Sequence, residues 1–158
     1  MVDFFSVDEL THGFWYPSSF VRVVELGLTD LEPWHVLEGA QLRQRGQGLV
    51  QRYPARTLVP FAIRQDNDDV ACWDLARGGE RIVVIHDFAT PGWEGRGEYP
   101  DLFGWLRQAI EDLIYFEWSH DPGINRPRPS RPLRDPHRQP VSRVPGPADD
   151  ADRLLHRR

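Results

Sequence analysis

Cysteine and lysine are the two residue types that this sequence most clearly lacks. Cys72 is the single cysteine, and every one of the 19 basic residues is arginine. A lone cysteine excludes an internal disulfide and a cysteine-based zinc cluster, and it fits a reducing compartment. Neither a metal nor another cofactor is expected.

Long apolar runs are missing as well. The longest aliphatic run, residues 82–85, is far shorter than the ~20 apolar residues that a membrane-spanning helix needs. The amino terminus carries Asp3, Asp8 and Glu9, where a secretory signal carries cations before its apolar stretch. We therefore expect a cytoplasmic protein that does not contact a membrane.

Charge and composition change sharply near residue 120. Residues 1–120 hold 10 arginines and 19 acidic residues, a formal charge of −9, whereas residues 121–158 hold 9 arginines and 5 aspartates, a formal charge of +4. All aromatic residues precede this point, and 8 of the 14 prolines follow it. This pattern predicts one domain over residues 1–120 and a disordered, Pro/Arg-rich tail over residues 121–158. Two alternatives for the tail stay open, namely that it contacts nucleic acid and that it folds back onto the acidic body.

Three β-rich runs occupy the middle of the chain, at residues 58–64, 70–75 and 81–88. Short segments of turn composition separate them, so they predict an antiparallel meander. The third run is apolar on both faces and is expected to be an interior strand. Pro60 cannot donate a ladder hydrogen bond, which predicts that the first run lies at an edge or contains a bulge.

Helices are expected before and after this meander along the chain. Ser18-Ser19 can cap a short amphipathic helix that ends at Gly27. Residues 30–56 predict irregular structure, because a helix-like entry is followed by the two glycines Gly46 and Gly48.

Asp101 can cap a long final helix with apolar residues at helical spacing. Phe103 and Ile114 widen that apolar stripe, so the helix is expected to be largely buried. Aromatic side chains are expected to carry much of the core: Trp15, Trp34, Trp73, Trp105 and Trp118. The fold class predicted is α+β, with helices at either end of an antiparallel meander.

Few residues form a pattern typical of catalysis or metal binding. Cys72 with His86 is a candidate nucleophile and base, and His86-Asp87 a candidate metal step, although all three lie in or beside an apolar strand. Residues 66–69 lack the Gly and Glu positions of a calcium loop and are typical of a hairpin turn. Residues 92–97 match no nucleotide-binding loop and predict a flexible loop that presents Trp93 or buries it.

Several short motifs occur over roughly residues 14 to 118: Tyr16-Pro17, Pro33-Trp34, Leu58-Val59-Pro60-Phe61-Ala62, Asp68-Asp69-Val70-Ala71-Cys72-Trp73, Val83-Val84-Ile85-His86, Pro91-Gly92-Trp93 and Phe103-Gly104-Trp105-Leu106. With these motifs the chain resembles the SUKH superfamily, which includes fungal cell-wall synthesis regulators and many bacterial immunity proteins. The resemblance implies a helix-flanked sheet and an activity that consists of binding, commonly the occlusion of a toxin domain that is often a nuclease. It carries over no catalytic residue.

The acidic body gives this expectation a physical reason. A formal charge of −9 over residues 1–120 attracts a basic nuclease and repels nucleic acid itself. We therefore expect an immunity-type protein, and the expected contacts are Asp66, Asp68, Asp69, Asp74, Trp93 and Glu94. Two other hypotheses stay open: a regulatory or scaffold module of the cell-wall regulator type, and an enzyme built on Cys72 or on His86-Asp87. The oligomeric state is left open.

Overall fold

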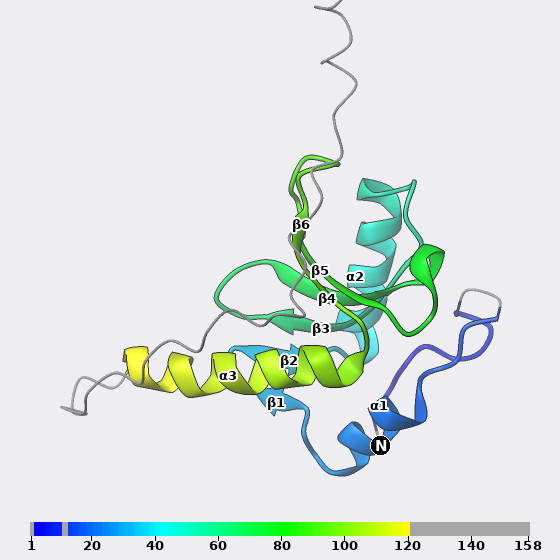
Figure 1. Ribbon diagram of the computed structural model, residues 1–158. Coiled ribbons are helices and arrows are strands. Elements are labelled where there is room, and N and C mark those ends of the chain that lie inside the picture. The colour runs from blue at the N-terminus through cyan, green and yellow to red at the C-terminus, as the bar shows by residue number, and fades with distance from the viewer. Residues whose placement is uncertain (1, 11–12, 121–158) are drawn as a thin grey trace, which may run out of the picture.

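A six-stranded antiparallel sheet forms the centre of the domain in the computed structural model, which describes residues 2–10 and 13–120, with side chains to residue 116. The sheet order follows the chain order, so the strands form a meander (Figure 1). The strands are β1 (Asp30–Leu31), β2 (Trp34–Val36), β3 (Leu58–Arg64), β4 (Asp69–Asp74), β5 (Ile82–His86) and β6 (Gly95–Tyr99). The predicted tail and the side chain of Trp118 lie outside the described residues.

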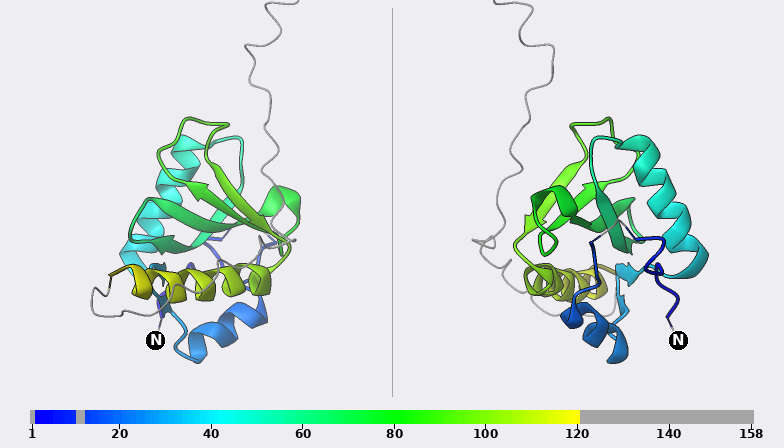
Figure 2. Two further views of the ribbon diagram at one scale, coloured as in Figure 1. Left: turned by 60° about the vertical axis from the view of Figure 1, so that its left-hand side comes forward. Right: turned by 90° about the vertical axis from the view of Figure 1, so that its right-hand side faces the viewer.

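Helices cover both faces of the sheet, which gives three layers (Figures 1 and 2). The helices are α1 (Ser18–Glu25), α2 (Gly39–Arg52) and α3 (Leu102–His120), and a 3-10 turn, η1 (Leu75–Arg77), follows β4. α1 and α3 pack on one face and α2 on the other. Within the described part of the chain, no helix is long and apolar enough to cross a bilayer. The α+β class and the antiparallel meander are confirmed.

The strand predictions are confirmed in their main features. β5 lies between β4 and β6, and its side chains alternate between two cores. Ile82 and Val84 point to the α1 and α3 side, whereas Val83 and Ile85 point to the α2 side. The register of β3 against β4 shifts just after Pro60, so the proline is accommodated by a bulge in an interior strand.

The core under α1 and α3 is rich in aromatic rings. Trp73 is fully buried on β4, and its ring centroid lies 4.3 Å from that of Phe61 and 5.1 Å from that of Phe20. Trp105 of α3 meets Phe61 edge to face at 4.8 Å and Trp34 at 5.6 Å. Burial on this scale makes the aromatic cluster the main apolar anchor of both helices.

The core under α2 is aliphatic. Leu42, Leu49 and Tyr53 line one face of the helix at helical spacing, and they pack on residues of β3, β4 and β5 that include Val70 and Cys72. The fully buried Cys72 occupies this core as a small apolar residue, as the alternation of β4 predicts.

The expectation of irregular structure over residues 30–56 is wrong. The segment forms β1, β2 and the 14-residue helix α2. Its glycines serve close packing, because a Cβ on Gly46 would lie 2.8 Å from Cζ of Phe5, and one on Gly48 would lie 2.5 Å from a guanidinium nitrogen of Arg52. Tertiary contacts therefore select glycine at positions that local propensity assigns to a break.

The predictions near α1 are confirmed at the end of the helix and wrong at its start. Gly27 ends the helix with a positive φ of 73°, as expected. Ser18 and Ser19 do not cap it, because Pro17 occupies the N-cap position and no side chain there accepts a hydrogen bond. Trp15 is exposed, so the prediction that it belongs to the core is wrong.

The final helix begins as predicted. An oxygen of the Asp101 carboxylate accepts a hydrogen bond from the backbone N–H of Gly104 at 2.9 Å. Leu102, Trp105 and Ala109 are buried against the sheet. Phe103 and Ile114, which we expected to widen the buried stripe, are exposed, so the helix is buried along one narrow face.

Candidate functional site

One end of the sheet brings together two loops that are distant in the sequence. The turn at residues 65–68 joins β3 to β4, and the loop at residues 87–94 joins β5 to β6. The backbone N–H of Asp87 donates to the carbonyl of Asp68 at 2.8 Å, so the loops are hydrogen-bonded to one another. The Asn67 side chain accepts from the backbone N–H of Asp69 at 2.9 Å, which confirms the predicted hairpin turn.

A polar groove of about 1030 Å³ separates α2 from this hairpin. Its α2 wall is made of amide and guanidinium side chains: Gln41, Gln44, Arg45, Gln47, Gln51 and Arg52. The facing wall consists of side chains from β2, β3 and the turn: His35, Ile63, Arg64, Gln65, Asp66, Asn67 and Asp68. We call this concavity the α2–hairpin groove. Its lining offers hydrogen-bond donors and acceptors on both sides.

Phe88 adds an aromatic ring to the same groove. The residue was predicted to lie on an apolar face of the third strand, but β5 ends at His86 and Phe88 takes a positive φ of 67°. The guanidinium of Arg52 lies 4.3 Å from the ring centroid, in cation–π geometry. Phe88 and Trp93, in the same loop, are each 62% exposed. An exposed aromatic ring held by an arginine is a preorganised contact for a partner.

A buried carboxylate holds the α2 wall in place. Asp87 is fully buried, and its oxygens accept from Arg52 Nε and Nη2 at 2.6 Å each and from Arg45 Nη1 at 2.5 Å. Burial alone would raise the pKa of Asp87, but the hydrogen bonds from Arg52 and Arg45 outweigh it and hold the pKa below the ordinary range of aspartate. The interaction ties α2 to the end of β5.

Asp66 and Asp68 lie at the exposed tip of the hairpin and in the wall of the groove. Arg64 binds Asp66 through two hydrogen bonds of 2.8 and 2.9 Å, and Asp68 lies 4.0 Å from Arg45 across the groove. The groove therefore carries charges of both signs, whereas all the charged residues among the expected contacts are acidic.

Asp69 and Trp93 belong to the same end of the sheet. The Asp69 carboxylate lies 2.9 Å from Nδ1 of His86, which stands opposite it in the β4–β5 register, and 4.0 Å from Arg96. Asp69 is half-buried, so its first role is to join β4 to β5 and β6. Trp93 projects from the neighbouring loop and is a stronger candidate for direct contact.

The expectation that Asp74 and Glu94 form part of an exposed contact surface is wrong. They are 3% and 7% exposed, and both bind Arg56, with N–O distances of 2.9 Å. Burial opposes ionisation of Glu94, yet hydrogen bonds from backbone groups and from Arg56 keep its pKa below the ordinary range of glutamate. The two carboxylates fix the segment after α2 against β4 and the β5–β6 loop.

The candidate catalytic pair is not brought together. Cys72 stands opposite Val83 in the register and points into the core under α2, whereas His86 stands opposite Asp69. Burial raises the pKa of the Cys72 thiol, which disfavours the thiolate that nucleophilic chemistry needs. Asp87 of the candidate metal step is occupied by two arginines. Over residues 2–10 and 13–120, no group of three or more His, Cys, Asp or Glu side chains is placed to hold a metal ion.

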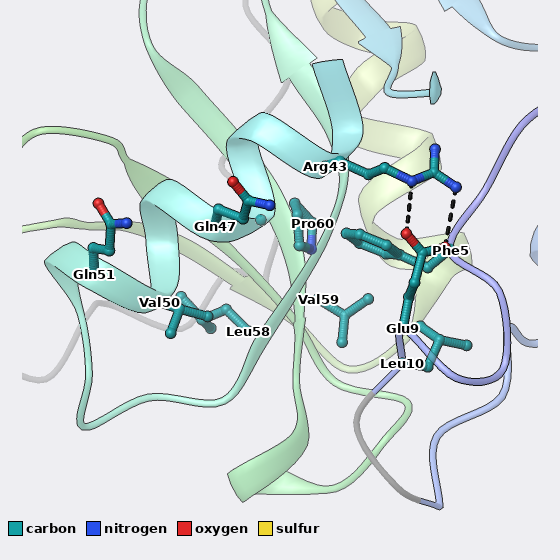
Figure 3. Close-up of a pocket in the computed structure, with 11 residues that line it drawn as sticks. Phe5, Glu9, Leu10, Arg43, Gln47, Val50, Gln51, Leu58, Val59 and Pro60 are labelled. Atoms are coloured by element: carbon teal, nitrogen blue, oxygen red, sulfur yellow. Dashed lines mark hydrogen bonds and ion pairs between the residues drawn. The ribbon is translucent and has the colours of Figure 1, made fainter. Parts of the chain in front are cut away.

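A second, smaller groove of about 440 Å³ lies on the other side of α2 (Figure 3). Phe5 and Leu10 of the amino-terminal segment, Val50 of α2, and Val59 and Pro60 of β3 give it a mostly apolar lining. Arg43 bridges its rim by donating to Glu9 and Asp3. The hydrogen bond from Arg43, together with one from the Ser6 backbone, lowers the pKa of Glu9 to about 2. The two bonds of Arg43 tie the amino-terminal segment to α2, so the groove is the seam between them.

The α2 wall and Phe88 are not among the contacts expected from the sequence. A signal was present, because Gln41, Gln44 and Arg45, Gln51 and Arg52 recur at helical spacing and place polar side chains on one face. The two interrupting glycines obscured that periodicity.

Comparisons with protein-family models, with curated protein sequences and with solved structures returned no significant match.

Proposed function

We propose that this chain is a cytoplasmic immunity-type binding protein of the SUKH kind, which neutralises a basic toxin domain by occupying its active surface. The proposed contact surface is the α2–hairpin groove together with Phe88 and Trp93. A nuclease is the toxin class that the charge of the body favours, because nucleases carry basic surfaces to bind their substrate.

The observation that carries the proposal is the composition of the groove. One wall presents glutamine amides with Arg45, the other presents Asp66, Asp68 and Asn67, and the exposed ring of Phe88 belongs to the same surface. Paired hydrogen-bonding walls beside an aromatic anchor suit an extended polypeptide segment, whose backbone and side chains can satisfy both walls.

Net charge and local contacts have separate roles in this proposal. The formal charge of −9 over residues 1–120 accelerates the approach of a basic partner, in a manner that salt weakens. The groove itself carries charges of both signs, since Arg45, Arg52 and Arg64 line it together with Asp66 and Asp68, and the buried Asp87 binds Arg45 and Arg52. Specificity is therefore assigned to hydrogen bonds and to the aromatic anchor.

The test begins with affinity purification of the tagged full chain from its native cells at low and at high salt. A basic toxin domain retained in stoichiometric amount, and loosened by salt, is the expected result. Expression of that domain should then arrest growth, and co-expression of the chain should restore it. A housekeeping protein in its place would favour the regulatory module of the cell-wall regulator type.

Matched variants then locate the surface. Phe88→Ala should weaken binding of the captured partner by about 30-fold or more, as loss of an aromatic anchor does. Asp66→Asn with Asp68→Asn should weaken it by about tenfold and flatten its salt dependence. The control pair Asp8→Asn with Glu80→Gln makes the same change in net charge at exposed positions away from the groove. An equal loss in the control pair would refute the groove and leave net charge as the sole cause.

A further inference from the structure

The outer face of α3 carries a row of exposed apolar side chains. Phe103, Ile110 and Ile114 are 62%, 43% and 46% exposed, although each is large and apolar. They are separated by seven and four positions, so they lie on one side of the helix. Other exposed apolar residues, such as Trp15 and Val50, belong to separate elements. The row on α3 is the kind of surface that marks an interface.

Two opposite charges interrupt this row. Arg107 is exposed and Glu111 is half-buried, and both fall on the same side of α3 as the apolar residues. Within the described part of the chain, neither forms an ion pair within 4.0 Å, although the nine other arginines of residues 1–120 all do. The face therefore offers one cation and one anion, four positions apart, between apolar ends.

The order of these residues makes the face complementary to itself. In an antiparallel pair of α3 helices related by a two-fold axis, Phe103 of one copy meets Ile114 of the other. The same axis places each Arg107 against the Glu111 of the other copy, which forms two equivalent ion pairs. A parallel pair would instead place like charges together. The order of the two charges along α3 therefore favours a second copy of the chain as the partner, and it favours an antiparallel arrangement of the two helices.

We propose that the chain forms a symmetric dimer through the outer face of α3, with Phe103 on Ile114 and Arg107 on Glu111 across the axis. The contact is a single helix pair, which is smaller than a standard interface, so the association is expected to be weak and concentration-dependent. α3 and α2 lie on opposite faces of the sheet (Figure 2), and the α2–hairpin groove is lined by α2, so both grooves stay open in the dimer. The dimer does not depend on the proposed function.

Charge reversal gives the sharpest test, with the full chain and sedimentation equilibrium over a wide concentration range. Arg107→Glu alone places four anions at the axis, and Glu111→Arg alone places four cations there. Each single variant should raise the dimer dissociation constant by about tenfold or more. An equimolar mixture of the two variants should form a heterodimer, because both ion pairs are restored in it. A change that acted only within one chain would not produce this rescue.

An apolar pair of variants provides the second measurement. Phe103→Asp should abolish the dimer, and an acid in the first turn of α3 favours the helix, so folding is retained. Val50→Asp is the matched control, since Val50 is 64% exposed on α2, and it should leave the dimer intact. Monomeric wild-type protein at all concentrations would overturn the proposal. The proposal would also be overturned if the dimer were unchanged in the charge reversals and in Phe103→Asp, because the interface would then lie elsewhere.

Discussion

The two faces of the sheet are held to their helices by different forces. Under α1 and α3, Trp73, Phe61 and Trp105 pack ring against ring, and the contact is almost entirely apolar. Under α2, a thinner aliphatic core is supplemented by buried carboxylates that bind arginines, with Asp87 as the central member. Stability on the first side comes from buried area, whereas on the second it also depends on ionisation.

Because of this difference, the interactions that depend on ionisation lie next to the candidate site. The arginines that bind Asp87 also line the α2–hairpin groove, so the walls of the groove keep their shape only while the buried carboxylate is charged. The aromatic side supplies a foundation that neither pH nor salt alters greatly. Variants on the two sides should therefore differ in kind as well as in size.

The largest effect is expected in the aromatic core. Trp73→Ala removes a fully buried ring and should lower the free energy of unfolding by about 4 kcal/mol, measured by urea denaturation. Trp15→Ala is the control, because Trp15 is exposed, and it should change stability by less than about 0.5 kcal/mol. Similar losses of unfolding free energy in both variants would contradict the assignment of Trp73 to the core and of Trp15 to the surface.

A smaller but still large loss is expected from Asp87→Asn. The amide leaves Arg45 and Arg52 without their shared charge partner, which should cost about 3 kcal/mol in unfolding free energy. Asp66→Asn, at an exposed carboxylate that also binds an arginine, should cost about 0.5 kcal/mol. If the two losses were equal, burial of Asp87 would not be the cause.

Acidification should affect the two sides unequally. The pKa values of Asp87 and Glu94 are lowered in the folded state, so the unfolded chain takes up protons at a higher pH than the folded one. Stability is therefore full at neutral pH and falls as the pH drops below about 4. The fall should be shallower in Asp87→Asn and unchanged in Trp73→Ala, when unfolding free energy is measured against pH. An identical slope in Asp87→Asn would contradict the assignment to Asp87.

A glycine in α2 offers a smaller and more diagnostic effect. Replacing an interior helical glycine by alanine ordinarily stabilises by about 1 kcal/mol. Gly48→Ala should instead destabilise by about 1 kcal/mol, because its Cβ would displace the Arg52 guanidinium from Asp87. In an Asp87→Asn background the ordinary gain should return, since Arg52 is then free to move. Thermal unfolding of the four proteins completes this double-mutant cycle.

The smallest effect on stability is expected at the hairpin tip. Asp66→Asn with Asp68→Asn should change the unfolding free energy by less than about 1 kcal/mol, since both side chains are exposed. The same pair is expected to change partner binding. A large loss of stability would show that the turn is structural, and the binding result would then require a milder variant.

Much of the sheet could be predicted because its signals are local. β-rich runs between segments of turn composition predicted β3, β4 and β5, Pro60 indicated an edge or a bulge, and Asp101 indicated the start of α3. These features depend on residues within one or two turns of each other.

The rest depends on contacts between distant segments. The helix α2 tolerates Gly46 because Phe5 packs against it, a contact that spans 41 positions and that no local pattern reveals. Asp74 and Glu94 are acidic in sequence but buried in the fold, because Arg56 meets both. The structure places Asp66 and Asp68 in the wall of the groove and leaves Trp93 exposed, and their role in binding stays a prediction. The α2 wall could be recognised only from the three-dimensional arrangement.

The turn at residues 65–68 belongs to neither core, so its residues can change without loss of packing. Its exposed side chains can be exchanged at little cost in stability, as can glutamines on the open face of α2. Both cores remain intact under such changes, because the sheet lies between them. Under the proposed function, substitutions at the surface of the groove would change the partner that is bound, while the aromatic core and the fold stay constant.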